Sequence, residues 1–233
     1  MSFLGKKLID TISTSIVQKG KNKYIMSELH PSLHPIKYQQ TFCMIKPDGV
    51  MRGLIGDIIK RIEKSGLKIV ALKMVVADEK MVRAHYPMSD EAWIHRLGEK
   101  SKSGFDNLDV TPKEILGSED EKELGAEVAE NLVSYMTSGP VVCMIVEGIQ
   151  AIDMVRKLAG NTLPFKAEIG TIRGDYSVDS PAIANAEKRS IHNLFHASEN
   201  PAEAANEISL WFGKDATHKY KLTHESVSFA KYY

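Results

Sequence analysis

The feature that most constrains the fold is the order in which short apolar runs alternate with amphipathic stretches. The clearest run is Val141–Val146, six apolar residues between Gly-Pro and Glu-Gly, which predicts a strand. Thr41–Ile45 and Leu67–Val76 predict two further strands, and the apolar residues around His196 predict a fourth. Apolar residues recur at helical spacing between these runs, so strands and helices alternate along the chain.

The predicted helices differ in clarity. Regular spacing predicts helices over Ile55–Ile62, Asp78–Tyr86, Ala126–Met136, Ile152–Leu158 and Pro201–Trp211. The stretch 88–128 is the least regular, with a short helix near Trp93 before a polar connection, and 161–190 has little periodicity. This order predicts an α+β fold, a ferredoxin-like split βαβ sandwich whose four-stranded antiparallel sheet has helices packed around it.

Composition narrows the functional class. The chain has 233 residues, of which 43% are apolar and 26% charged, as in soluble globular proteins. Thirty basic residues balance thirty acidic ones, so no large basic field for nucleic acid is indicated. Cys43 and Cys143 lie in strand-like runs and are expected to be reduced core residues of a cytoplasmic protein. No apolar run is long enough to span a membrane.

The chain divides into three parts. Residues 1–40 contain an amphipathic stretch, followed by a linker arm with Pro31 and Pro35. That stretch fits a helix docked on the body or on a neighbouring subunit, or alternatively a weak membrane-surface anchor. Residues 41–213 form the main domain with an insertion near 88–128, and residues 214–233 form a C-terminal tail.

A histidine near the C-terminal end is the first candidate for chemistry. His196 lies in a predicted strand, Ser198 follows it, and Glu207 comes eleven residues later in the helix opened by Pro201. A histidine held by a carboxylate and a hydroxyl suits nucleophilic or acid–base catalysis, although a buried, satisfied histidine gives the same pattern. His192 and His196 are also four apart, as metal ligands on a helix would be, but a strand fits the local apolar run better.

Isolated cations beside tight turns are the second candidate. Lys46 precedes Pro-Asp-Gly, Arg156 precedes Gly-Asn-Thr, and Arg173 lies within Thr-Ile-Arg-Gly-Asp. The sequence contains neither a P-loop nor a Gly-x-Gly-x-x-Gly motif. Fixed cations are what phosphoryl transfer requires, and a neutral imidazole can attack phosphorus. A single surface cation, however, is usually only solvated.

Taken together, these motifs resemble the nucleoside diphosphate kinase family. They occur in family order from about residue 41 to 213: Ile45-Lys46-Pro47-Asp48-Gly49-Val50, Arg52-Gly53-Leu54, His85-Tyr86, Ser138-Gly139-Pro140, Glu147-Gly148, Arg156, Gly160-Asn161-Thr162, Gly170-Thr171-Ile172-Arg173-Gly174-Asp175, Asn193-Leu194-Phe195-His196-Ala197-Ser198, Glu207 and Trp211-Phe212. The resemblance implies the same ferredoxin-like sheet. It also implies a transferase that passes the γ-phosphate of ATP to nucleoside diphosphates and so balances nucleoside triphosphate pools.

The resemblance further implies a role for each matched residue. His196 would carry the phosphate as phosphohistidine in a ping-pong mechanism, with Glu207 and Ser198 holding its ring. The expected nucleotide-binding residues are Lys46, Tyr86, Arg156, Thr162, Arg173 and Asn193. Mg²⁺ is the expected cofactor, held mainly through the nucleotide phosphates rather than by protein ligands. A homo-oligomer, a hexamer by resemblance, is expected as well.

The sequence departs from the family pattern at three places. Ala197 stands where the family usually has glycine, the stretch 88–128 is longer than usual, and so is the loop 176–192. The residue that stacks on the base cannot be assigned from the motifs. We expect the insertion to lie at the nucleotide-binding edge and to add little base discrimination, because every base has a π-face. A catalytically silent binding module and a nucleic-acid-binding regulator are the competing hypotheses.

Overall fold

The computed structural model describes residues 38–106 and 108–225. The predicted N-terminal amphipathic helix, the arm as far as residue 37 and the tail beyond residue 225 lie outside this part. Of the described residues, those up to 221 belong to one compact unit and 222–225 belong to a second. Of the second unit only 222–225 are described, a turn in which Glu225 N–H donates to the carbonyl of Leu222.

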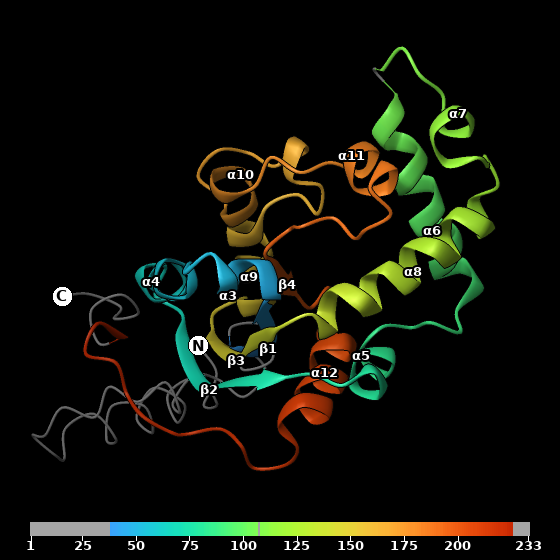
Figure 1. The fold of residues 1–233 in the computed structure, drawn as a ribbon. Coiled ribbons are helices and arrows are strands. Elements are labelled where there is room, and N and C mark those ends of the chain that lie inside the picture. Colours follow the sequence, from blue (N-terminus) through green and yellow to red (C-terminus); the bar gives the residue numbers. More distant parts are fainter. Residues whose placement is uncertain (1–37, 107, 226–233) are drawn as a thin grey trace, which may run out of the picture. The chain divides into compact units, whose positions relative to one another are not determined.

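The described part contains strands and helices in the predicted order (Figure 1). The strands are β1 (Gln39–Ile45), β2 (Lys68–Val76), β3 (Pro140–Gly148) and β4 (Phe195–Ala197). The α-helices are α3 (Pro47–Met51), α4 (Ile55–Lys64), α5 (Glu79–His85), α6 (Glu91–Lys102), α7 (Pro112–Leu116), α8 (Glu121–Thr137), α9 (Ala151–Ala159), α10 (Ile172–Tyr176), α11 (Pro181–Ala186) and α12 (Pro201–Phe212). Two short 3₁₀ turns are η3 (Ser103–Phe105) and η4 (Pro164–Lys166).

The four strands form one antiparallel sheet in the order β2-β3-β1-β4, which confirms the predicted fold class. Strand β1 lies in the middle and pairs with β3 along its length and with β4 at its end, where Met44 lies opposite His196. Successive side chains of a strand point to opposite faces. Both faces of β1 are buried, because Phe42, Cys43, Met44 and Ile45 are each 0% exposed.

Helices cover both faces of the sheet and so create two layers of core. On one face, Cys43 and Ile45 pack with Ile58 of α4 and Val155 of α9. On the other face, residues of β1 and β3 pack with α5, α8 and α12, in a cluster that includes Phe42, Cys143, Val82, Met136 and Trp211. Cys43 and Cys143 are buried and free, as predicted.

The last strand and the last helix form as the sequence predicts. Strand β4 ends at Ala197, and the Asn200 side chain then accepts a hydrogen bond from Glu203 N–H and caps α12, with Pro201 in its first turn. Within α12, Glu207 is one of three buried positions at helical spacing, together with Ala204 and Trp211. Helix periodicity therefore turns Glu207 toward the sheet rather than toward solvent.

Two stretches contain more helix than predicted. Helix α8 begins at Glu121, five residues before the predicted start at Ala126, because the Asp120 side chain caps the backbone N–H groups of Lys122 and Glu123. The stretch 161–190 holds α10 and α11, five and six residues long, each capped by the residue before it. Helices this short show no periodicity in a sequence.

Helices α6 and α8 pack through a close crossing at two glycines. A Cβ atom added at Gly98 of α6 would lie 1.9 Å from the backbone oxygen of Glu121, and one added at Gly125 of α8 would lie 2.0 Å from that of Ile94. Only glycine permits such an approach. These two contacts fix α6 against α8 at the position where α6 borders the cleft described below. No helix of the described part is long and apolar enough to cross a membrane.

Candidate active site

A cleft of about 870 Å³ contains almost the whole predicted site. The residues that line it come from elements far apart in the sequence, among them α5, α6, α9, β4 and α12. All of the predicted site residues except Ser198 line it: Lys46, Tyr86, Arg156, Thr162, Arg173, Asn193, His196 and Glu207. The fold therefore brings together residues that lie up to 161 positions apart in the sequence, from Lys46 to Glu207.

The centre of the cleft is a relay of three side chains. Nε2 of His196 lies 2.7 Å from Oε1 of Glu207, and the Ser198 hydroxyl donates to Oε2 of the same carboxylate at 2.5 Å. Ser198 is fully buried, and it also contacts the carbonyl oxygen of Phe42 at 3.1 Å. Glu207 is only 4% exposed, so its carboxylate is held from both sides. The imidazole consequently has a fixed orientation.

This contact decides which ring nitrogen can react. A carboxylate accepts hydrogen bonds, so Nε2 of His196 carries the proton and Nδ1 has the free lone pair. Burial, together with the positive charges of Lys46, Arg173 and Arg156, lowers the pKa of His196 to about 3. The ring is therefore neutral at pH 7, the state in which nitrogen can attack phosphorus. Burial raises the pKa of Glu207, against the opposing effects of His85 and Ser198.

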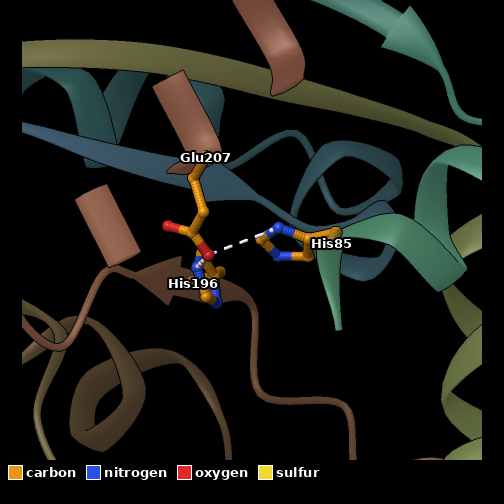
Figure 2. A group of neighbouring side chains, drawn as sticks. All are labelled: His85, His196 and Glu207. Carbon is orange, nitrogen blue, oxygen red and sulfur yellow. Dashed lines mark hydrogen bonds and ion pairs between the residues drawn. The ribbon is translucent and has the colours of Figure 1, made fainter. Parts of the chain in front are cut away.

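His85, which the sequence analysis quoted within a motif but did not assign to the site, lies in direct contact with this relay (Figure 2). Its Nδ1 is 3.3 Å from Oε1 of Glu207, and its ring meets the His196 ring edge-on at 4.6 Å between centroids. Trp211 Nε1–H donates to the same Nδ1 at 3.2 Å. The sequence signal that points to His85 is its position directly before Tyr86 in the matched motif.

Lys46 and Asn193 form a second pair on the cleft wall. Nζ of Lys46 donates to Oδ1 of Asn193 at 2.8 Å, and the Asn193 amide donates to the carbonyl of Thr162 at 3.1 Å. Burial lowers the pKa of Lys46 to about 7, the charge of Arg173 adds to this effect, and Asp48 opposes it. The ammonium is therefore held in a dry position, where a phosphate or hydroxyl oxygen would be bound strongly.

The two predicted arginines are placed very differently. Arg173 is buried, and its guanidinium donates to the carbonyls of Gly160, Asn193 and Phe195 at 2.6, 3.2 and 2.6 Å. Burial lowers its pKa to about 10. Three of its five donors therefore hold the backbone that leads into β4. Arg156 is exposed at the cleft, and its side chain makes no hydrogen bond or ion pair within residues 38–106 and 108–225.

Tyr86 forms an aromatic wall rather than a free hydroxyl at the surface. Its ring stacks on Trp93 at 6.0 Å and meets the His196 ring edge-on at 6.3 Å. Its hydroxyl is buried and has no partner in the described part of the chain, and burial raises its pKa. An oxygen in this state is available to a ligand that enters the cleft.

Further cations line the cleft that the sequence analysis did not identify. Arg96 and Lys100 lie on α6 and face the cleft together with Trp93. Their spacing of three and four residues was the available signal, because it places these side chains on one helix face. Arg189 also lines the cleft, and it is held by Asp179 at 2.5 Å.

The alternative pair of metal ligands, His192 with His196, does not form. His196 lies in β4 rather than on a helix, and the His192 ring stacks on Tyr135 at 5.2 Å. Among the described residues, two groups have ligand atoms close enough for a metal ion, and neither includes His192. They are His85 with His196 and Glu207, and His95 with Glu99 and Glu121.

Comparison with known proteins gives a consistent result. The family model of nucleoside diphosphate kinase matches residues 39–104 and 116–217. The nucleoside diphosphate kinase of Pyrobaculum aerophilum is 48% identical over 177 residues, which are 76% of this chain and 96% of that protein. That of Borreliella burgdorferi is 37% identical over 187 residues, 80% of this chain and 95% of that protein.

Solved structures agree with these sequence matches. The crystal structure of the Pyrobaculum aerophilum NDP kinase superposes with a TM-score of 0.73 at 45% identity, covering 78% of this chain and 100% of that one. A transition-state mimic of the Borrelia burgdorferi enzyme with bound vanadate and ADP gives 0.64 at 37% identity, covering 82% and 96%. Fold, cleft and comparisons lead to one conclusion: this chain belongs to the nucleoside diphosphate kinase family of phosphotransferases.

Proposed function

We propose that this protein transfers the γ-phosphate of ATP to nucleoside diphosphates in two half-reactions, through a phosphohistidine at His196. The observation that carries the proposal is the fixed, neutral imidazole at the centre of a cleft lined with cations. Its Nε2 is engaged by Glu207 at 2.7 Å, and its Nδ1 retains a lone pair. The competing hypotheses of a silent module and a nucleic-acid regulator give no reason for this arrangement.

In the first half-reaction, the Nδ1 lone pair of His196 forms a bond to the γ-phosphorus. The bond from that phosphorus to the bridging oxygen breaks, and its electron pair leaves with ADP. Positive charge that develops on the ring is stabilised by the Glu207 carboxylate through Nε2–H. In the second half-reaction, a terminal phosphate oxygen of the acceptor diphosphate attacks the phosphorus and the N–P bond breaks, which restores the neutral ring.

The remaining residues would bind the nucleotide. Lys46 and Asn193 present an ammonium and an amide that are already paired at 2.8 Å, suited to a sugar hydroxyl and to phosphate oxygens. Arg156 and Thr162 are exposed on the cleft wall, where they can meet the phosphates. Arg173 has two donors left beyond its carbonyl contacts. Fixed cations of this kind stabilise the charge spread over the transferring phosphoryl group.

Magnesium is proposed as the cofactor, held mainly by nucleotide phosphates. The cleft fits this role because the carboxylates of Glu199 and Glu203 line it, and hard oxygen groups suit Mg²⁺ and its waters. When bound, the ion would neutralise phosphate charge.

We also propose a homo-oligomer, a hexamer by family resemblance, in the cytoplasm. The edge strand β2 exposes the alternating apolar side chains Leu72, Met74 and Val76, which are 51%, 56% and 66% exposed and would gain from being covered. The free thiols of Cys43 and Cys143 suit a reducing compartment. Light scattering at micromolar protein tests the assembly, and a monomer mass would refute it.

The test of the chemistry is transfer of label from γ-labelled ATP to the protein in the presence of Mg²⁺. Wild type should carry an acid-labile, base-stable label, as a phosphoramidate does, and should lose it on addition of a nucleoside diphosphate. His196→Ala should fold and carry no label, while the matched control His192→Ala should behave as wild type. Label that persists in His196→Ala would refute the assignment.

A further inference from the structure

His85 lies against the relay at His196 and offers a ligand atom that the proposed phosphotransfer does not use. Nδ1 of His85, Nε2 of His196 and Oε1 of Glu207 come from α5, β4 and α12 and converge on one point (Figure 2). One ligand atom from each residue lies within 4.8 Å of the other two. His85 and Glu207 are 0% and 5% exposed at their side chains, so water competes little for these atoms.

The hydrogen bonds around these atoms place two lone-pair-bearing atoms side by side. The indole N–H of Trp211 can only donate, and it reaches Nδ1 of His85 at 3.2 Å, so this Nδ1 must present a lone pair. The same Nδ1 lies 3.3 Å from Oε1 of Glu207, which also presents lone pairs. The proton of His85 is then on Nε2, which is buried and without a partner in the described part of the chain. Two acceptors therefore face each other, and an ion bound between them would displace the Trp211 N–H from Nδ1 of His85 and the His196 N–H from Oε1 of Glu207.

We propose that a borderline-soft divalent cation, with Zn²⁺ as the best fit, binds to His85, His196 and Glu207 from the cleft. Two histidines and one glutamate are a ligand set that Zn²⁺ uses in proteins, with its fourth position left to water or substrate. All three residues line the cleft, from which the ion would enter. The close approach of the His85 and Glu207 acceptors, 3.3 Å apart, becomes favourable when a cation lies between them.

The proposed ion would block phosphotransfer, a consequence that rests on the proposed function. Zn²⁺ on Nε2 of His196 displaces the proton from that nitrogen, and in a neutral ring the proton then resides on Nδ1. Nδ1 no longer has the lone pair that attacks phosphorus. Zinc at this site is therefore an inhibitor that competes with phosphorylation of His196, and it is distinct from the magnesium carried by the nucleotide.

Ligand chemistry separates the two ions. Mg²⁺ prefers oxygen ligands and retains several waters, whereas imidazole nitrogen favours zinc and its neighbours in the transition series. Excess Mg²⁺ should therefore not displace the ion from the histidines. The second cluster, His95 with Glu99 and Glu121, is exposed and already neutralised by Lys102, which lies 2.9 Å from Glu121. Metal bound at this second cluster would be mistaken for metal bound at the proposed site.

The experiment is a Co²⁺ titration of nucleotide-free full-length protein, followed by visible absorption, in excess Mg²⁺. All proteins carry His95→Ala, which removes the exposed cluster. The parent should show an intense tetrahedral band that saturates at one Co²⁺ per chain and that Zn²⁺ abolishes. His85→Phe keeps a ring against His196 but removes a ligand, and it should lose the band or weaken binding at least tenfold. An unchanged band in His85→Phe would overturn the proposal.

A second measurement tests the metal site even if the His85→Phe variant does not fold. Anomalous scattering from a zinc-soaked crystal of the parent should place one ion between the three side chains, and zinc found only elsewhere would overturn the proposal. Zinc should also prevent labelling of His196 by γ-labelled ATP, with a half-inhibiting concentration at least tenfold higher in His85→Phe. If His196 carries no label even without zinc, the proposed function fails, while the cobalt band still decides the metal site.

Discussion

The imidazole of His196 and the carboxylate of Glu207 belong to different elements, β4 and α12, yet their Nε2 and Oε1 atoms lie 2.7 Å apart. Two independent constraints produce this distance. Pairing with Met44 of β1 fixes His196 at the edge of the sheet, and the buried stripe of α12 fixes Glu207 above it. The fold itself therefore fixes the orientation of the His196 ring, whose Nδ1 is the proposed nucleophile.

Weakening this contact should slow phosphorylation without abolishing it. In Glu207→Gln the nucleophile remains, but the charge that stabilises the ring is lost, and we expect a fall of about 10²-fold in the rate of phosphorylation, typical of lost alignment. Ser198→Ala removes only the hydrogen bond behind the carboxylate and should cost less. Single-turnover labelling at saturating ATP measures both. A greater loss in Ser198→Ala than in Glu207→Gln would contradict this order.

Substitution of Arg173 should mainly lower the stability of the fold, whereas substitution of Arg156 should mainly raise KM for ATP. Arg173→Lys keeps a charge but cannot serve three carbonyls, so we expect the free energy of unfolding to fall by about 3 kcal/mol. Arg156→Ala should change stability by less than about 0.5 kcal/mol because the side chain is exposed, while KM for ATP rises. Urea unfolding and steady-state kinetics separate the two effects. Equal stabilities would show that the Arg173 contacts contribute little.

Lys46 should give the enzyme a basic limb near neutral pH. Its pKa is lowered to about 7 by burial and by Arg173, so the ammonium that would bind phosphate is lost as pH rises through that value. Since kcat/KM reports ionisations of the free enzyme, it should fall above about pH 7. In Lys46→Arg the limb should disappear, because guanidinium stays charged. A wild-type profile that is flat to pH 9 would refute this assignment.

The same ionisation has a consequence for stability with the opposite sign. In the unfolded chain a lysine titrates near 10.4, so between about pH 7 and 10 the unfolded state binds more protons than the folded state. The free energy of unfolding should therefore rise across this range in wild type relative to Lys46→Met, since burying the charged ammonium is costly only while it stays protonated. Urea unfolding at several pH values measures the difference between the two proteins.

The glycine contacts between α6 and α8 should be necessary for the shape of the cleft wall. Gly98→Ala places a Cβ atom where the backbone oxygen of Glu121 lies, and overpacking of this kind costs about 1–3 kcal/mol. The matched control is Gly56→Ala on α4, which meets nothing within 4 Å and should be neutral or stabilising through helix propensity. Urea unfolding measures both. KM for ATP should rise in Gly98→Ala alone, because α6 carries cleft residues.

Much of the site was predictable from the sequence, because local patterns carry its chemistry. Periodicity identified all four strands and the helix that holds Glu207, since a buried face leaves a repeat of two or of 3.6 residues. Motif order then identified the residues that line the cleft, and the structure brings eight of the nine predicted residues to its wall. Short helices such as α10 and α11 were not predicted, because five or six residues make less than two helical turns and leave no repeating pattern.

The sequence by itself determined the order of elements and the antiparallel sheet, and it pointed to His196 as the histidine that we propose to react. Only the tertiary structure decided that the ring of His85 contacts that of His196, 111 residues later in the chain. It also decided that Arg173 donates to three backbone carbonyls, and that α6 contacts α8 closely at Gly98. The reason is physical. A periodic pattern states which face of an element is buried, but which side chain of another element meets that face depends on strand register and helix crossing, and these are set by packing of the whole core.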